Sequence, residues 1–152
     1  MRILRQFLVL QAFMLWQGGF VFYAAVVVPA GTGIHGAHGQ GLVTQRVTDW
    51  LNVFGLAWHL LYGWDIFASE HFPLRKSLWY FSFVLLAFLT AVHRHLDRLI
   101  VANKVHVDDF HQMHAVYLIA STALWLLALV HLVLMLCDWA WNNRAAAESR
   151  RV

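Results

Sequence analysis

Four stretches of this sequence are long, apolar and almost free of charge, and they constrain the fold more than any other feature. The first, Phe7 to Pro29, holds no charged residue, and the second holds the single acid Asp65. A helix needs about 20 apolar residues, at a rise of about 1.5 Å each, to cross the hydrocarbon of a bilayer. The sequence therefore predicts an all-α fold, an antiparallel bundle of four transmembrane helices. The expected spans are residues 7–29, 50–69, 77–93 and 113–138.

The composition also indicates a membrane protein. Of the 152 residues, 61% are hydrophobic and 12% are charged, whereas soluble domains average about 25% charged residues. Four spans leave no room for a second domain, so residues 1–152 are expected to form a single integral membrane domain whose main partner is the lipid bilayer. The net charge of +3 reflects anchoring residues near the spans and does not indicate nucleic-acid binding.

An even number of spans places both termini on one side of the membrane. The apolar run after Met1 is too long for the core of a signal peptide, so we expect it to be retained as the first helix. Seven Lys and Arg residues fall on the side of the termini and four on the other. The positive-inside rule then predicts cytoplasmic termini, in a bacterial inner membrane. The expected connections are an outer loop at 30–50, an inner turn near Pro73 and an outer loop at 94–112.

Polar residues in the second span follow the period of a helix. They are separated by three, four, three and three positions: Asn52, Gly55, His59, Tyr62 and Asp65. This spacing keeps them on one helical face. Lipid cannot satisfy such groups, so the face is expected to point into the bundle. Because ionisable groups inside a membrane are costly, they are candidate functional positions.

Two pairs follow from depth counted along the helices at about 1.5 Å per residue. His59 is expected to hydrogen-bond to Gln17, and Asp65 is expected to pair with His131 in the fourth span. Such pairs either hold the helices together or line a proton or substrate path. On the same count His59 and His131 differ by about 8 Å in depth, so they are poorly placed as two axial ligands of one haem. Ligation of haem by a single histidine stays open.

Seven of the ten histidines map to the outer side, most densely between residues 106 and 114. This stretch contains His106, Asp108, His111 and His114. With Asp108 as a helix N-cap, His111 and His114 lie one turn apart on one helical face. Imidazole and carboxylate at this spacing suit zinc, copper, nickel or iron, and a copper or zinc ion is the expected cofactor. The competing interpretation is a set of solvated loop histidines.

The first outer loop begins with the glycine-rich stretch PAGTGIHGAHGQG, residues 29–41. It contains the dinucleotide-binding pattern GxGxxG, which requires a preceding strand and a following helix. We reject this function because the preceding valines end an uncharged span that Pro29 is expected to close. We expect a flexible connector instead, in which His35 and His38 close over His111 and His114 as additional metal ligands.

Short motifs carry a resemblance to a known family. They are Gly18-Gly19-Phe20-Val21-Phe22, Pro29, His95-Leu-Asp-Arg98 and Phe110-His-Gln-Met-His114. With this four-span layout, the chain resembles the uncharacterised four-helix membrane family that includes the eukaryotic transmembrane protein linked to platinum-drug resistance. The resemblance implies a fold and a membrane location but no established activity. A remoter likeness to bacterial copper-resistance membrane domains, which place His and Met near the outer face, implies copper.

Three functional hypotheses stay open. The first is a metal-handling accessory, or a subunit of a larger membrane assembly, with a His-rich outer face. The second is a membrane redox subunit associated with haem or a quinone. The third is a homo-oligomeric transporter that uses the Asp65 and His131 stripe. The sequence shows no set of nucleophile, base and oxyanion donors, so it does not indicate an enzyme.

Overall fold

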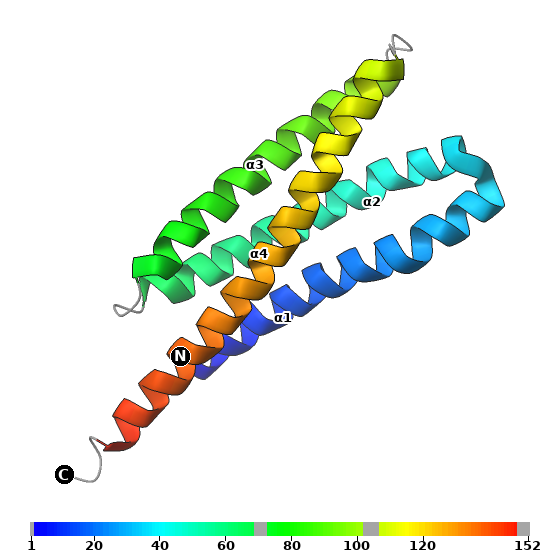
Figure 1. Cartoon of the computed structure of the whole chain (residues 1–152). Helices are drawn as coiled ribbons and strands as arrows, with labels where there is room; N and C mark the ends of the chain where they lie inside the picture. The colour runs from blue at the N-terminus through cyan, green and yellow to red at the C-terminus, as the bar shows by residue number, and fades with distance from the viewer. Residues whose placement is uncertain (1, 69–72, 102–106, 149–152) are drawn as a thin grey trace.

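The computed structural model describes residues 2–68, 73–101 and 107–148, and every element within these ranges is helical. In chain order the elements are α1 (Arg2–Phe22), the π-helical turn η1 (Tyr23–Val27), α2 (Val28–Phe67), α3 (Pro73–Val101) and α4 (Val107–Glu148). The predicted all-α bundle of four helices is thereby confirmed (Figure 1).

Consecutive helices run in opposite directions, and α1 packs on α2, α2 on α3, and α3 on α4. The two termini, the end of α2 and the start of α3 lie towards one end of the bundle, here called the termini end (Figure 1). A bend at Gly36, the end of α3 and the start of α4 lie towards the opposite end, here called the distal end. The α1–α2 hairpin and the α3–α4 hairpin diverge at the distal end.

Three helical stretches of the described chain are long and apolar enough to cross a membrane: Arg2–Gly36, Pro73–Arg98 and Gln112–Arg144. The predicted span at 50–69 is not among them, because its polar residues lower its hydropathy. Many large apolar side chains point outward, including Phe7, Phe81 and Ile119, which are 59%, 62% and 72% exposed. Such a surface suits lipid contact, since lipid is as apolar as the side chains that face it.

The expectation that Pro29 ends the first helix, with a loop at 30–50, is wrong. The helix widens into η1, where the Val28 N–H donates to the Tyr23 carbonyl, and then continues as α2. A proline has no N–H to donate to the carbonyl four residues earlier, and a π-turn accommodates this loss without ending the helix. The glycine-rich stretch is therefore helical on both sides of one break.

The break lies at Gly36, whose φ of 70° and ψ of 174° are non-helical. This is the region of backbone space that glycine alone adopts readily. The bend folds α2 back so that the Gln40 carboxamide lies directly against the backbone of Gly31, where a Cβ atom would overlap it. The glycines of residues 29–41 thus make a tight helical turn-back, and not a flexible loop.

We expect Gly36→Ala to destabilise the protein by about 1–3 kcal/mol, because alanine is strained at this φ and ψ. Gly33→Ala is the matched control, since Gly33 is helical and has open space around its Cα. That control should be neutral or stabilising by up to about 1 kcal/mol. Thermal unfolding in detergent measures both, and equal transition temperatures would contradict the assignment of the bend to Gly36.

The predicted second outer loop, 94–112, is also too long. Helix α3 continues to Val101 and α4 begins at Val107, so Asp108 lies in the first turn of α4 and is not its N-cap. The predicted position of the inner turn, near Pro73, agrees with the structure, because Pro73 is the first residue of α3. Proline is favoured there since the N–H it lacks would have no helical partner.

The core runs along the middle of the bundle. Its fully buried apolar residues come from all four helices and include Val9, Trp58, Leu89, Ala128 and Met135. Trp58 is 1% exposed and stacks between Trp16 and Tyr62, with both pairs of ring centroids 5.2 Å apart. This aromatic ladder separates a charged site at the termini end from a cavity at the distal end.

Candidate functional site

The polar face of residues 52–65 points into the bundle, as the sequence predicts. His59, Tyr62 and Asp65 are between 0% and 1% exposed, and Gly55 is also buried. Gly55 and Gly63 permit the close approach of tryptophans, since a Cβ atom would lie 3.0 Å from the Trp16 ring in one case and 2.9 Å from the Trp79 ring in the other.

Asp65 is the centre of a buried ion cluster at the termini end, formed by Arg5, Asp65, Arg75 and Asp138. Its Oδ1 accepts a hydrogen bond from Arg5 Nε at 3.0 Å, and its Oδ2 accepts one from Arg75 Nη2 at 3.0 Å. The Trp139 indole N–H also donates to Oδ2, at 3.1 Å. Because these groups come from all four helices, the cluster fixes the arrangement of the bundle at this end.

Arg75 joins the two acids of the ion cluster. Its Nη1 donates to Asp138 Oδ2, its Nε donates to the Tyr62 hydroxyl at 3.3 Å, and its guanidinium lies 5.2 Å from the centre of the Tyr62 ring. Asp138 and Arg75 are each 1% exposed. Two guanidinium groups face two carboxylates, so the cluster is electrically balanced, as buried charges require.

The sequence interpretation missed Arg5, Arg75 and Asp138 as interior residues. It counted the two arginines as anchors at the membrane surface and gave Asp138 no role. The available signal was the position of opposite charges at one end of several apolar helices, which meet when the helices are antiparallel. The sequence cannot say which of the arginines at that end turn inward.

The pairs expected for the histidines are not the ones observed. Neither side-chain atom of Gln17 has a hydrogen-bond partner, and His59 Nδ1 bonds instead to the Gly55 carbonyl at 2.8 Å. His131 Nε2 lies 3.1 Å from the Ser82 hydroxyl, while Asp65 binds arginines. These partners depend on how the helices pack against one another, which a count of residues along each helix does not contain.

The depth difference predicted for His59 and His131 is also wrong. Both rings pack edge-on against Trp58, at centroid distances of 4.7 Å and 5.9 Å, so they lie at one level. Trp58 fills the space beside both rings, and the distal cavity described next does not reach either of them. The packing therefore gives no support to ligation of a haem by these histidines.

A cavity of about 940 Å³ lies between the two hairpins in the distal half of the bundle, here called the distal cavity. Its wall is mostly apolar, with Trp16, Leu86 and Leu124 among the lining residues. Polar side chains from both hairpins interrupt that wall: Gln40, Thr44, Thr48, Asn52, His93, Asp97, His114 and Tyr117. Cavities of several hundred Å³ with a few polar groups are typical small-molecule sites.

Two carboxylates converge on one imidazole at the edge of the distal cavity. His93 Nε2 lies 3.2 Å from Asp49 Oδ1 and 3.4 Å from Asp97 Oδ2, yet neither contact has the geometry of a hydrogen bond. The His93 side chain is 7% exposed, while Asp97 and Asp49 are 29% and 53% exposed. We call Asp49, His93 and Asp97 the outer trio.

The outer trio has the dimensions of a metal site. Its three ligand atoms lie within 4.8 Å of one another. With metal–ligand bonds of about 2.1 Å, the edges of a tetrahedron and an octahedron measure about 3.4 Å and about 3.0 Å. The two distances from His93 Nε2 fall in this interval. The one-turn spacing of His93 and Asp97 on α3 could have been noticed in the sequence, but Asp49 belongs to a region expected to be a loop.

The predicted outer histidines are only partly placed by the structure. His114 lines the distal cavity together with His93, and His35 is an exposed residue just before the bend. His38, Asp108 and His111 lie in helices, but their side chains are outside the described part, and His106 lies outside the described residues. The predicted closure of His35 and His38 over His111 and His114 stays a prediction.

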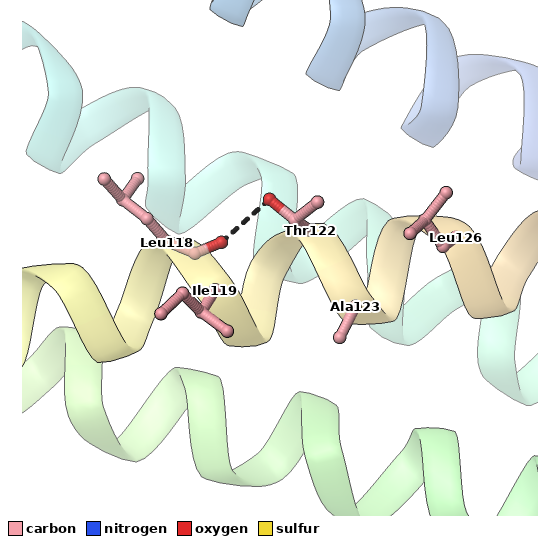
Figure 2. Close-up of a pocket in the computed structure, with 5 residues that line it drawn as sticks. All are labelled: Leu118, Ile119, Thr122, Ala123 and Leu126. Carbon is pink, nitrogen blue, oxygen red and sulfur yellow. Dashed lines mark hydrogen bonds between the residues drawn. The ribbon is translucent and has the colours of Figure 1, made fainter.

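A second, shallow apolar depression lies on α4 and is formed by Leu118, Ile119, Thr122, Ala123 and Leu126. Figure 2 shows that these side chains project from one helix, and that the Thr122 hydroxyl bonds to the Leu118 carbonyl of that helix, at 2.9 Å. The Thr122 hydroxyl, the single polar side-chain group of this depression, therefore already has a hydrogen-bond partner. The depression has no other polar side chain that could bind a ligand.

No family model matches the chain, and no curated protein or solved structure matches it either. The resemblance to the four-helix family stays a prediction.

Proposed function

We propose that this chain is an integral membrane protein that binds a divalent metal ion at Asp49, His93 and Asp97. The observation that carries the proposal is the convergence of two carboxylate oxygens on His93 Nε2 without a hydrogen bond. Such a protein acts as a metal-handling accessory, or as a subunit of a larger membrane assembly, and needs no catalysis of its own.

The donor set favours some metals over others. Two carboxylates and one imidazole suit zinc, manganese or iron(II), whereas copper(I) prefers sulfur ligands. Three protein ligands leave coordination positions for water or for a group delivered by a partner. With both termini in the cytoplasm of a bacterial cell, as the charge bias favours, the outer trio faces away from the cytoplasm. It is then reached from the outer side, which suits capture of a metal.

Metal binding to the purified protein in nanodiscs tests the proposal. Cobalt(II) serves as the probe, because its visible absorption reports the ligand geometry, and zinc competition gives the affinity. We expect one equivalent per chain. His93→Ala should weaken binding by more than about 100-fold, because loss of a partner that only supports a ligand already costs about 10–100-fold. Asp97→Asn should also weaken it strongly.

The matched control is His95→Ala, because His95 is exposed on the same helix, two residues from His93. This variant should bind the metal as the wild type does. Retention of full affinity by His93→Ala would overturn the site. If binding were lost instead in His111→Ala and His114→Ala, the histidines predicted from the sequence would hold the metal.

The transporter hypothesis has less support from the geometry. Asp65 accepts hydrogen bonds from Arg5, Arg75 and Trp139, and a carboxylate held by two arginines is well suited to stabilise the bundle. A transport path through Asp65 would require these contacts to open. The ion cluster is therefore expected to stabilise the bundle.

A further inference from the structure

We propose that the metal ion bound by the outer trio is a bridge that holds the α1–α2 hairpin against the α3–α4 hairpin at the distal end. With the ion bound, the mouth of the distal cavity is narrow, and when the ion leaves, the two hairpins separate there. This inference rests on the metal site proposed above and adds what the bound ion does to the bundle.

The three ligands of the outer trio come from both hairpins. Asp49 belongs to α2, whereas His93 and Asp97 belong to α3. His93 Nε2 lies 3.2 Å from Asp49 Oδ1, so the two helices already approach each other closely enough to share an ion. An ion that binds all three side chains therefore joins one hairpin to the other, and Asp49 is the ligand on which this bridge depends.

Hydrogen bonds between the hairpins hold the termini half of the bundle together. Asp65 of α2 accepts hydrogen bonds from Arg75 of α3 and Trp139 of α4. The indole N–H of Trp79, on α3, donates to the His59 carbonyl of α2 at 2.9 Å. Since His59 packs against the aromatic ladder, these bonds extend from the termini end as far as that ladder. A bundle tied together over this half can open at the other.

The distal cavity, of about 940 Å³, lies between the hairpins on the other side of the ladder, where the hairpins diverge (Figure 1). Leu42 of α2 and Leu118 of α4 line the cavity and are each 51% exposed, so they mark its mouth on opposite hairpins. The width of the mouth therefore depends on the separation of the hairpins. Among the described residues, the contact of Asp49 with His93 joins the hairpins at the edge of this cavity.

The charges of the outer trio make its closure depend on an ion. The three ligand atoms lie within 4.8 Å of one another, and two of them are carboxylate oxygens. Like charges at this distance repel each other, and the repulsion acts between α2 and α3 because Asp49 and Asp97 belong to different hairpins. His93 Nε2 makes no hydrogen bond to either carboxylate, so it does not hold them in place. A divalent cation replaces the repulsion by attraction, because both carboxylates then bind the ion.

Distances between spin labels on the two hairpins test the bridge, in nanodiscs and with diamagnetic zinc as the ion. Val43→Cys and Ile119→Cys carry the labels, because both side chains are exposed and they belong to α2 and α4, next to the leucines of the cavity mouth. Cys137→Ser removes the exposed free thiol of the chain. Saturating zinc should shorten the mean distance between the labels and narrow its distribution.

A second label pair, at the termini end, controls for a change of the whole bundle. Leu4 of α1 and Leu136 of α4 are 60% and 46% exposed and belong to opposite hairpins. After replacement by labelled cysteines, their distance should be the same with and without zinc, because the ion cluster already holds this end. An equal shift in both label pairs would mean that zinc moves the hairpins as whole bodies and would overturn the bridge.

Two variants that each remove one carboxylate separate bridging from binding. Asp49→Ala leaves His93 and Asp97, both on α3, whereas Asp97→Ala leaves one ligand on each hairpin. Both should bind cobalt more than about tenfold more weakly, the lower limit for losing a residue that only supports a ligand. With enough zinc to occupy the site, the distal distance should still shorten in Asp97→Ala and should stay unchanged in Asp49→Ala.

Failure of the bridge and failure of the metal site give different results. If the wild type binds one equivalent of cobalt but zinc leaves the distal distance unchanged, the bridge is wrong and the metal site stands. Equal shortening in Asp49→Ala and Asp97→Ala would also show that the ion does not act through Asp49. If the wild type binds no cobalt, both proposals fail. Where a variant does not fold or does not take up zinc, the two label pairs of the wild type decide.

Discussion

Replacing Arg75 with alanine should lower the free energy of unfolding by about 3–5 kcal/mol, the cost of leaving buried charges uncompensated. Arg75 contacts Asp65, Asp138 and Tyr62 and is itself 1% exposed. Its removal leaves Asp138 without its arginine, while Asp65 keeps the hydrogen bonds from Arg5 and from the Trp139 indole. Equilibrium unfolding in mixed detergent micelles, followed by circular dichroism, measures the change.

Lys76→Ala is the matched control for this prediction. Lys76 is the next residue on α3 and its Nζ lies 5.9 Å from the centre of the Phe67 ring, a contact worth about 0.5–1 kcal/mol. Arg75→Lys should recover only part of the loss, because an ammonium group cannot hold two carboxylates and a hydroxyl in the planar geometry of a guanidinium. If Arg75→Ala were as stable as Lys76→Ala, the ion cluster would not hold the helices together.

Trp58→Ala should destabilise the protein by about 3–5 kcal/mol, the range for removing a large aromatic residue from a core. Trp58 is 1% exposed and contacts rings from three helices, through Phe13, Tyr62 and His131. Alanine would leave a void in the middle of the bundle that these rings cannot fill. The same unfolding measurement applies.

Trp50→Ala controls for the general effect of losing a tryptophan, since Trp50 is 63% exposed. Its replacement should change the free energy of unfolding by much less. A similar loss in both variants would mean that burial in the core is not what makes Trp58 important for stability. The aromatic ladder would then not be the element that separates the ion cluster from the distal cavity.

Paired charges and unpaired polar groups occupy different parts of the bundle. At the termini end every described charge of the ion cluster has an opposite charge beside it. Buried side-chain atoms without a hydrogen-bond partner lie outside the ion cluster, on Gln17, Gln40, Asn52, Trp58, His59, His93, Trp125 and His131.

Several properties of this protein could be read directly from the order of its residues. Long uncharged runs predict helices, because a bilayer leaves the backbone no other way to satisfy its hydrogen bonds. The three-residue spacing of His59, Tyr62 and Asp65 placed one face towards the bundle interior, since only a packed interior can pair such groups. These conclusions depend on local periodicity and on the solvent, and they were confirmed.

The contacts between helices depend on how the helices pack and bend, which cannot be read from any single stretch of the sequence. The packing of α4 against α2 and α3 set His131 beside Trp58 and Ser82. The bend at Gly36 and the π-turn before Pro29 continued a helix through a region rich in glycine. Asp49 lies beside His93 for the same reason. The distance between them is set by how α2 and α3 pack and not by their spacing along the chain.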